Sequence, residues 1–241
     1  MCGIVAVTGY KKALPLLING LEKLEYRGYD SAGIAIINPE TNSISCNKAE
    51  GKLKNLISNL NDKNIPGTVG IGHTRWATHG KPEVKNAHPH IDSTGTLAVV
   101  QNGIIENFQD LKIKLQNEGI IFNSDTDTEV IPHLIQKELN TLSKLNLENN
   151  GSTLLVAVRN VISDLEGSYA LAVLWSGAPT SLVVARKQAP LIIGLGEGEV
   201  ICASDTPAIA NFTNIILPMD CLLYTSPSPR DSRVSRMPSS A

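Results

Sequence analysis

The chain begins Met1-Cys2-Gly3-Ile4-Val5-Ala6-Val7, so a cysteine directly follows the initiator and a β-branched apolar run follows the cysteine. The continuous Ile, Val and Ala content predicts a fully buried strand over residues 2–8, which Gly9 ends. Removal of Met1, which the small side chain of Cys2 permits, would leave a thiol and a free α-amine on one residue. Such an amine titrates near neutral pH, as a general base requires. The stretch alone favours an inert cysteine at the head of a buried strand, and an amino-terminal nucleophile is the alternative that further residues must support.

Composition indicates one globular domain in a reducing compartment. The chain has 241 residues, of which 42% are hydrophobic and 18% charged, and no Pro/Gly/Ser-rich linker interrupts its middle. A net charge of -2 gives no electrostatic reason to expect nucleic acid or an anionic membrane as partner. The four cysteines form no CxxC pair, which argues against a zinc ribbon and a disulfide framework. Because the chain has neither a signal segment nor an apolar run near the ~18 residues that span a bilayer, we expect a cytoplasmic protein.

Hydrophobic periodicity predicts strands near both ends of the chain and helices between them. The expected strands cover residues 2–8, 34–37, 43–46, 68–76, 96–100, 169–175, 181–186, 191–195 and 200–203. The expected helices cover residues 14–24, 51–60, 106–118, 130–135 and 153–165, with a surface loop over 140–151. This order favours two sheets with helices outside them.

Two local signals qualify these elements. Thr126-Asp127-Thr128-Glu129 matches a capping box, and Pro132 inside the following apolar run predicts a kink or a late helix start. Asn102-Gly103 is typical of a turn, so the strand before it would end at a hairpin tip.

The final stretch, residues 222–241, differs from the rest of the chain. It is rich in Ser, Pro and Arg, its prolines are spaced for neither strand nor helix, and it cannot bury a core. It resembles a translated cloning adaptor more than natural protein. We therefore expect a domain over residues 2–220, truncated at its carboxyl end, and a disordered, non-native tail.

Four polar clusters carry candidate chemistry: Cys2, residues 72–80, residues 101–103 and residues 124–127. Each also has an ordinary structural explanation. Arg75 could be a surface cation, Trp76 a core aromatic and Asp127 a helix cap. The histidines at positions 73, 79, 88 and 90 lack a carboxylate or thiol at ligand spacing, so we expect no metal site.

Taken together, the clusters resemble the glutaminase domain, a class II glutamine amidotransferase, of the glucosamine-6-phosphate synthase (glutamine-fructose-6-phosphate aminotransferase, isomerizing) family. Seven ordered blocks carry the resemblance over residues 2 to about 220: 1–5, 25–33, 73–80, 86–90, 102–107, 124–130 and 203–205. The blocks at 26–30 and 75–80 look more like this family than like amidophosphoribosyltransferase.

The resemblance implies an α+β fold, a four-layer αββα sandwich of the N-terminal nucleophile hydrolase type. It also implies that Cys2 attacks the side-chain amide of glutamine while its own α-amine relays the proton. Asn102, through its side-chain amide, and Gly103, through its backbone N–H, would form the oxyanion hole. Fixed donors at the developing charge make chemical sense, because loss of one typically costs about 10²–10³ in rate.

Glutamine is a zwitterion, so its recognition needs one cation and one anion at fixed positions. By the resemblance, Arg75 binds the α-carboxylate and Asp127 accepts from the α-ammonium. The resemblance also implies that Thr78 and His79 belong to the loop that closes over glutamine. It implies that Arg27 lies beside the nucleophile and that Trp76 gates the ammonia path.

The family requires no cofactor, and its full-length members, expected to be homodimers, pass ammonia to fructose-6-phosphate in a sugar isomerase domain. That domain is absent from this sequence, so we expect at most glutamine hydrolysis. Two alternatives stay open: the glutaminase domain of another, amidophosphoribosyltransferase-like amidotransferase, and a non-catalytic glutamine-binding module.

Overall fold

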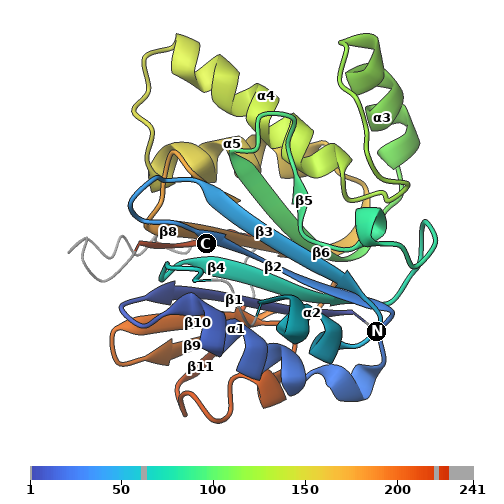
Figure 1. Cartoon of the computed structure of the whole chain (residues 1–241). Helices are drawn as coiled ribbons and strands as arrows, with labels where there is room; N and C mark the ends of the chain where they lie inside the picture. Colours follow the sequence, from blue (N-terminus) through green and yellow to red (C-terminus); the bar gives the residue numbers. More distant parts are fainter. Residues whose placement is uncertain (1, 61–63, 220–222, 228–241) are drawn as a thin grey trace.

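Two antiparallel sheets lie face to face between two layers of helices (Figure 1). The computed structural model describes residues 2–60, 64–219 and 223–227. The predicted α+β sandwich with helices outside two sheets is confirmed. In the described part of the chain, no helix is long and apolar enough to cross a membrane.

The larger sheet has seven strands in the order β11-β9-β10-β1-β4-β2-β3. Their bounds, in that order, are Ile216–Pro218, Ile192–Gly196, Glu199–Ala203, Gly3–Gly9, Gly70–Arg75, Ser31–Ile37 and Ile44–Glu50. The smaller sheet has the order β12-β8-β7-β6-β5. Its strands cover Leu223–Pro227, Ser181–Lys187, Gly167–Trp175, Leu97–Ile105 and His90–Ile91. The amino-terminal strand β1 is thus central in its sheet, as its continuous apolar content predicts.

The helices divide between the two outer faces (Figure 1). Helices α1 (Ala13–Glu22) and α2 (Leu53–Leu60) pack on the seven-stranded sheet. Helices α3, α4 and α5 pack on the five-stranded sheet and cover Phe108–Asn117, Val130–Lys144 and Gly151–Ser163. Three short 3-10 turns, η1 to η3, cover Glu25–Arg27, Val84–Asn86 and Thr206–Ala208.

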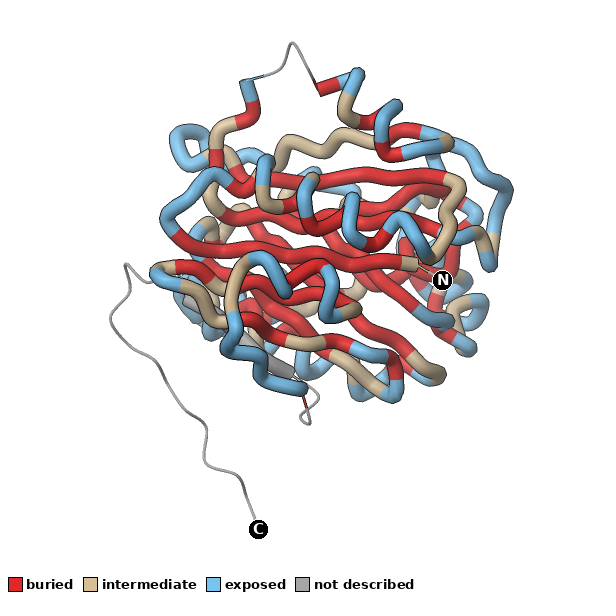
Figure 2. Tube along the Cα trace, turned by 90° about the horizontal axis from the view of Figure 1, so that it is seen from below, coloured by how far each residue is buried: buried red, intermediate tan, exposed pale blue. Residues whose placement is uncertain are grey.

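The layer between the sheets is apolar through most of its length. Ile4 and Ile71 from the larger sheet pack with Val100 and Ala172 from the smaller one, and all four are fully buried. The strands are buried along most of their length, whereas exposed residues lie mainly on loops and outer helix faces (Figure 2). Dense packing on both faces therefore fixes how the strand ends are placed.

Strand register brings several polar residues together where three central strands of the larger sheet begin or end. Gly3 of β1 pairs with Thr74 of β4, and Ser31 of β2 pairs with Arg75 of β4. The start of β1, the start of β2 and the end of β4 therefore meet, and Cys2 lies beside these strand ends.

Strand β6 continues through Asn102-Gly103, so the hairpin-tip alternative is wrong. Both residues pair with β7, opposite Ala170 and Tyr169. Gly103 has a φ of 104°, and a Cβ there would lie 2.0 Å from the backbone oxygen of Ser168. The glycine serves close strand approach and a left-handed backbone rather than a chain reversal.

The capping box at residues 126–129 is also wrong. Helix α4 begins at Val130, and the Glu129 carboxylate accepts hydrogen bonds from the backbone N–H groups of Asn123 and Ser124. The predicted late start is confirmed, because Pro132 lies in the first turn, where its missing N–H costs nothing. The expected loop over 140–151 is shorter than predicted, since α4 continues to Lys144.

Part of the expected disordered tail is ordered. Residues 223–227 form β12, which pairs antiparallel with β8. The edge of β8 offers backbone donors and acceptors that recruit an extended segment whatever its composition. The rest of the predicted tail, residues 222 and 228–241, lies outside the described residues. Sequence pattern also missed β5 and β11, which have two and three residues and are too short to show a period.

Candidate active site

Cys2 lies half-buried immediately before β1, with its thiol against the end of β4. Its Sγ accepts a hydrogen bond from the backbone N–H of Trp76 at 3.2 Å and lies 3.5 Å from the Trp76 carbonyl oxygen. Burial raises the pKa of the Cys2 thiol, while the Trp76 N–H and the Arg75 charge act in the opposite direction. The thiol is thus held by backbone, and its activation needs a nearby base.

Two side chains hold the carbonyl oxygen of Cys2. Arg27 Nη1 donates to it at 3.1 Å and Asn102 Nδ2 at 3.2 Å. Arg27 is itself fixed by an ion pair with Asp205, in which Nη2 lies 2.6 Å from the carboxylate. Arg27 and Asn102, both predicted site residues, therefore anchor the backbone of Cys2.

Arg75 binds the loop that follows it. Its guanidinium donates to the backbone carbonyls of His79, Gly80 and Lys81, the last at 3.4 Å, and lies 3.5 Å from the Asp30 carboxylate. The side chain is almost wholly buried, so these bonds replace its lost hydration. In this structure Arg75 organises residues 76–81 rather than standing as the surface cation of the alternative interpretation.

Asp127 lies in the loop before α4 and is also buried. One carboxylate oxygen accepts the Ile105 N–H at 2.8 Å, and the other lies 3.9 Å from His79 Nδ1. Burial raises the pKa of Asp127, while the Ile105 N–H and His79 oppose that shift. Asp127 caps no helix, so the helix-cap alternative is wrong, and its side chain lines the same pocket as that of His79.

These groups line one small, narrow pocket. The lining residues are Cys2, Arg75, Trp76, Thr78, His79, His88, Gln101, Gly103, Thr126 and Asp127. The structure thus brings together seven of the nine predicted site residues, and the other two, Arg27 and Asn102, contact Cys2 directly. Trp76 is 54% exposed and lies against Gly28 at the pocket rim, so it is not a core aromatic.

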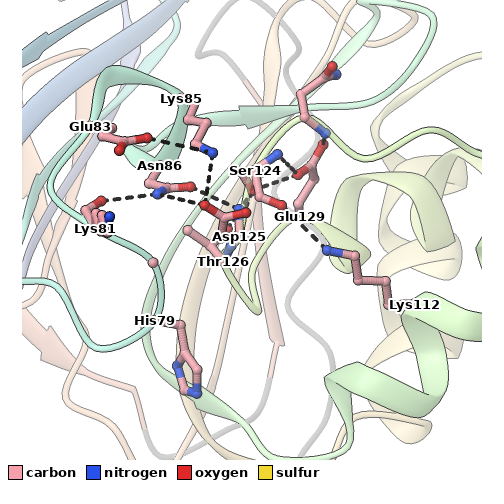
Figure 3. A network of polar contacts seen from close by, with 12 residues as sticks. His79, Lys81, Glu83, Lys85, Asn86, Lys112, Ser124, Asp125, Thr126 and Glu129 are labelled. Atoms are coloured by element: carbon pink, nitrogen blue, oxygen red, sulfur yellow. Dashed lines mark hydrogen bonds and ion pairs between the residues drawn. The ribbon is translucent and has the colours of Figure 1, made fainter.

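A polar network ties the two loops around the pocket together (Figure 3). Asn86 accepts from the Asp125 N–H at 2.8 Å, and Lys85 pairs with the Asp125 carboxylate at 2.9 Å. Behind them Glu129 accepts from the Ser124 N–H and hydroxyl. The loop that presents Asp127 is therefore braced from both sides, and its position does not depend on a helix cap.

Three buried histidines form the wall behind the pocket. The rings of His73 and His88 stack at 4.2 Å, and His90 meets His88 edge-on at 4.8 Å. Burial lowers the pKa of all three, that of His73 to about 3. Among the described residues, no three His, Cys, Asp or Glu side chains are grouped so that they could hold a metal ion.

The sequence placed Gln101 and Thr126 in polar clusters but assigned them no role, and it weighed His73 and His88 individually only as metal ligands. Strand alternation contained the signal for His73. Positions 73 and 75 of one strand share a face, so a functional Arg75 predicts that His73 points into the same layer. Gln101 and Thr126 are adjacent to predicted site residues, but nothing in their own pattern distinguishes them.

Comparisons with known proteins agree with this geometry. A family model described as a glutamine amidotransferase domain matches residues 73–211. Relatives named glutamine--fructose-6-phosphate aminotransferase (isomerizing) from Thermosynechococcus vestitus and a Nostoc species are 54% and 53% identical over 220 residues. Those matches cover 91% of this chain but only 34% of each relative, so the chain spans about a third of their length.

The fold matches solved amidotransferases. A glutamine phosphoribosylpyrophosphate amidotransferase from B. subtilis has a TM-score of 0.73 and 27% identity, covering 94% of this chain and 49% of that one. A second structure, described as the allosteric regulatory enzyme of purine biosynthesis, has a TM-score of 0.74 at 27% identity. On the family match and the relatives at over 50% identity, the chain belongs to the glutamine amidotransferase domain family.

Proposed function

We propose that this chain is the glutaminase domain of a glucosamine-6-phosphate synthase and hydrolyses glutamine to glutamate and ammonia through a thioester on Cys2. One observation carries the proposal: a thiol, a glycine in left-handed conformation, a buried arginine and a buried aspartate line the same pocket. This set matches what amide hydrolysis of a zwitterionic amino acid requires. The relatives' shared name supports the same reading.

The first step is attack of the Cys2 sulfur on the glutamine side-chain carbonyl carbon. After removal of Met1, the α-amine of Cys2 takes the thiol proton, so the nucleophile and its base share one residue. The C=O electron pair moves onto the oxygen, which receives hydrogen bonds from the Asn102 amide and the Gly103 N–H. The Trp76 N–H, 3.2 Å from Sγ, stabilises the thiolate before attack.

The tetrahedral intermediate then breaks its C–N bond, and the amine of Cys2 returns its proton to the departing ammonia. Water attacks the resulting glutamyl thioester, its proton passes to the same amine, and glutamate leaves as the thiol re-forms. Every proton transfer passes through the terminal amine, so the mechanism requires that Met1 be absent.

Arg75 and Asp127 recognise the two charges of glutamine. Asp127 accepts from the α-ammonium with the oxygen that now faces His79. Arg75 binds the α-carboxylate by exchanging some of its bonds to the carbonyls of residues 79–81, so glutamine binding reorders that loop. Thr78 and His79 move with it to cover the substrate, and Trp76 at the rim gates the ammonia path.

The acceptor belongs to a part of the protein beyond this chain. We propose that residues 2–220 form the glutaminase domain of a longer, cytoplasmic homodimer in which a sugar isomerase domain passes the ammonia to fructose-6-phosphate. The relatives are about three times as long as the matched region and carry fructose-6-phosphate in their name. A phosphoribosyl acceptor fits less well. The solved structure named for that acceptor is 27% identical to this chain, whereas the relative named for fructose-6-phosphate is 54% identical.

The test is glutamate formation by the purified chain and two cysteine variants. Cys2→Ala is expected to lose all glutaminase activity. Cys46→Ala, which changes a half-buried thiol on β3 away from the pocket, serves as the matched control and is expected to keep it. Tight glutamine binding by both the unaltered chain and Cys2→Ala, without glutamate from either, would instead establish a binding module.

A further inference from the structure

The side chain of Asn102 has a buried partner that the mechanism above does not use. His73 Nε2 lies 2.9 Å from Asn102 Oδ1, and both groups are buried between the sheets. On the other side of the same amide, Asn102 Nδ2 donates to the Cys2 carbonyl oxygen at 3.2 Å. The Asn102 amide is therefore hydrogen-bonded through both its oxygen and its nitrogen.

These two contacts determine where the hydrogens lie. The Cys2 carbonyl only accepts, so the NH₂ end of Asn102 must face it, and Oδ1 must face His73. Because Oδ1 also only accepts, His73 Nε2 must carry the hydrogen. An amide rotated by 180° would set oxygen against oxygen at Cys2, so the Cys2 carbonyl selects the orientation and His73, as the Nε2–H tautomer, holds it.

Stacking holds the His73 ring in place. His88 lies 4.2 Å away with the rings 22° from parallel. The Gln101 N–H donates to His88 Nδ1 at 3.2 Å, so His88 Nε2 carries the hydrogen and donates to Thr128 Oγ1 at 3.2 Å. That hydroxyl in turn donates to Gln101 Oε1 at 2.7 Å. Behind the His73 ring, these hydrogen bonds close a ring of uncharged groups through Gln101, His88 and Thr128.

The charge state of His73 is fixed by its surroundings. Burial, together with the nearby Arg75 charge, lowers the pKa of His73 to about 3 despite the bond to Asn102. At neutral pH the ring is therefore uncharged and donates through Nε2 throughout the reaction.

We propose that His73 is a positioning residue for the oxyanion hole: its Nε2–H fixes the Asn102 amide so that the second N–H of the NH₂ group points at the developing oxyanion. The inference rests on the proposed glutaminase function. Because Asn102 Nδ2 has two hydrogens and the Cys2 carbonyl takes one, the other is free for the substrate oxygen. A donor preset in this way needs no reorganisation during the reaction, which is the source of oxyanion-hole catalysis.

The test uses two amide replacements that differ in reach. In His73→Gln the side-chain nitrogen falls near the position of Nε2, whereas in His73→Asn it reaches only the position of Nδ1. Both keep a neutral polar group at the site. We expect His73→Asn to lower kcat on the order of 10- to 100-fold with little change in KM, and His73→Gln to stay within roughly 5-fold of the unaltered chain.

A double-mutant cycle with Asn102→Ala separates positioning from structure. Asn102→Ala should cost about 10²–10³ in kcat, and adding His73→Asn should cost almost nothing more, because the group that His73 orients is gone. Equal rates for the Asn and Gln variants, or a full additional loss in the double variant, would overturn the inference while leaving the glutaminase proposal intact. An unaltered chain that forms no glutamate would overturn both.

Discussion

The layer between the two sheets has two ends of opposite chemistry built on the same strands. On β4, Ile71 packs in the apolar core between the sheets, and two residues later His73 stands in the polar wall behind the pocket. On β6, Val100 lies in that core and Asn102 two residues later holds the Cys2 carbonyl. Since alternate residues share a face, the packing that fixes the apolar end also aims the polar end. Rigidity and chemistry are thus supplied by neighbouring positions of one strand.

The largest effect should come from the polar end. In Gly103→Ala the new methyl carbon would meet the Ser168 carbonyl at 2.0 Å in a backbone with φ of 104°. We expect glutaminase activity to fall by at least about 10²–10³ because β6 must shift away from Cys2. Gly95→Ala, with φ of 73° but nothing within 4 Å, is the control and should cost only about 1 kcal/mol of stability with activity kept. Comparable activity in the two variants would show that β6 need not hold this geometry.

At the apolar end the effect should fall on stability alone. Ile71→Ala empties part of the core between the sheets, and we expect the free energy of unfolding to drop by about 2–5 kcal/mol, with Ile71→Val costing about 0.5–1.5 kcal/mol. Urea unfolding measures this loss, and kcat per folded molecule should change little. A loss of kcat in Ile71→Val, out of proportion to its stability, would mean that the two ends are not separable.

The remaining effect is a pH dependence of stability. His73, His88 and His90 are neutral when folded because burial lowers their pKa, so only the unfolded chain binds these protons below its ordinary pKa of about 6.5. Stability should be fully present above that pH and fall as pH drops toward the folded values, by roughly 1.4 kcal/mol per pH unit for each histidine protonated only on unfolding.

The charged groups that act on the histidines are Arg75, Lys48 and Glu129, and Asp127 lines the same pocket as His88. Although burial opposes it, the nearby His133 side chain and hydrogen bonds from Asn123 and Ser124 lower the pKa of Glu129 to about 2, so its contribution is lost only below its ordinary range. Asp127, whose pKa is raised, acts in the opposite direction. Urea unfolding at pH 7, 6 and 5 measures the balance, and a free energy that does not fall over this range would contradict the neutral histidine wall.

Sequence reasoning predicted the layers and most strands because each buried strand carries its own apolar run. It placed Cys2, Arg75 and Asp127 through a family resemblance, since single residues have no period from which a role could be read. It was wrong where the conformation or role of a residue depends on a partner distant in the sequence. Asn102-Gly103 is typical of a turn locally, and only pairing with β7 makes it strand.

The capping-box prediction that included Glu129 was wrong for the same reason. Three residues after Thr126, Glu129 completes a capping pattern, but the carboxylate is taken by the N–H groups of residues 123 and 124, and the helix starts after it. Local patterns state what a residue can do, and tertiary contacts select which of those options is used.

The role of Cys2 is tested most directly by trapping the chain during turnover. The protein would be mixed with glutamine, quenched in acid, and its amino-terminal peptide examined by mass spectrometry. A terminal nucleophile requires a peptide that begins at Cys2, lacks Met1, and carries a glutamyl group on the cysteine sulfur. An active protein that retains Met1, or one whose glutamyl group lies on another residue, would contradict the central claim that Cys2 is a terminal nucleophile.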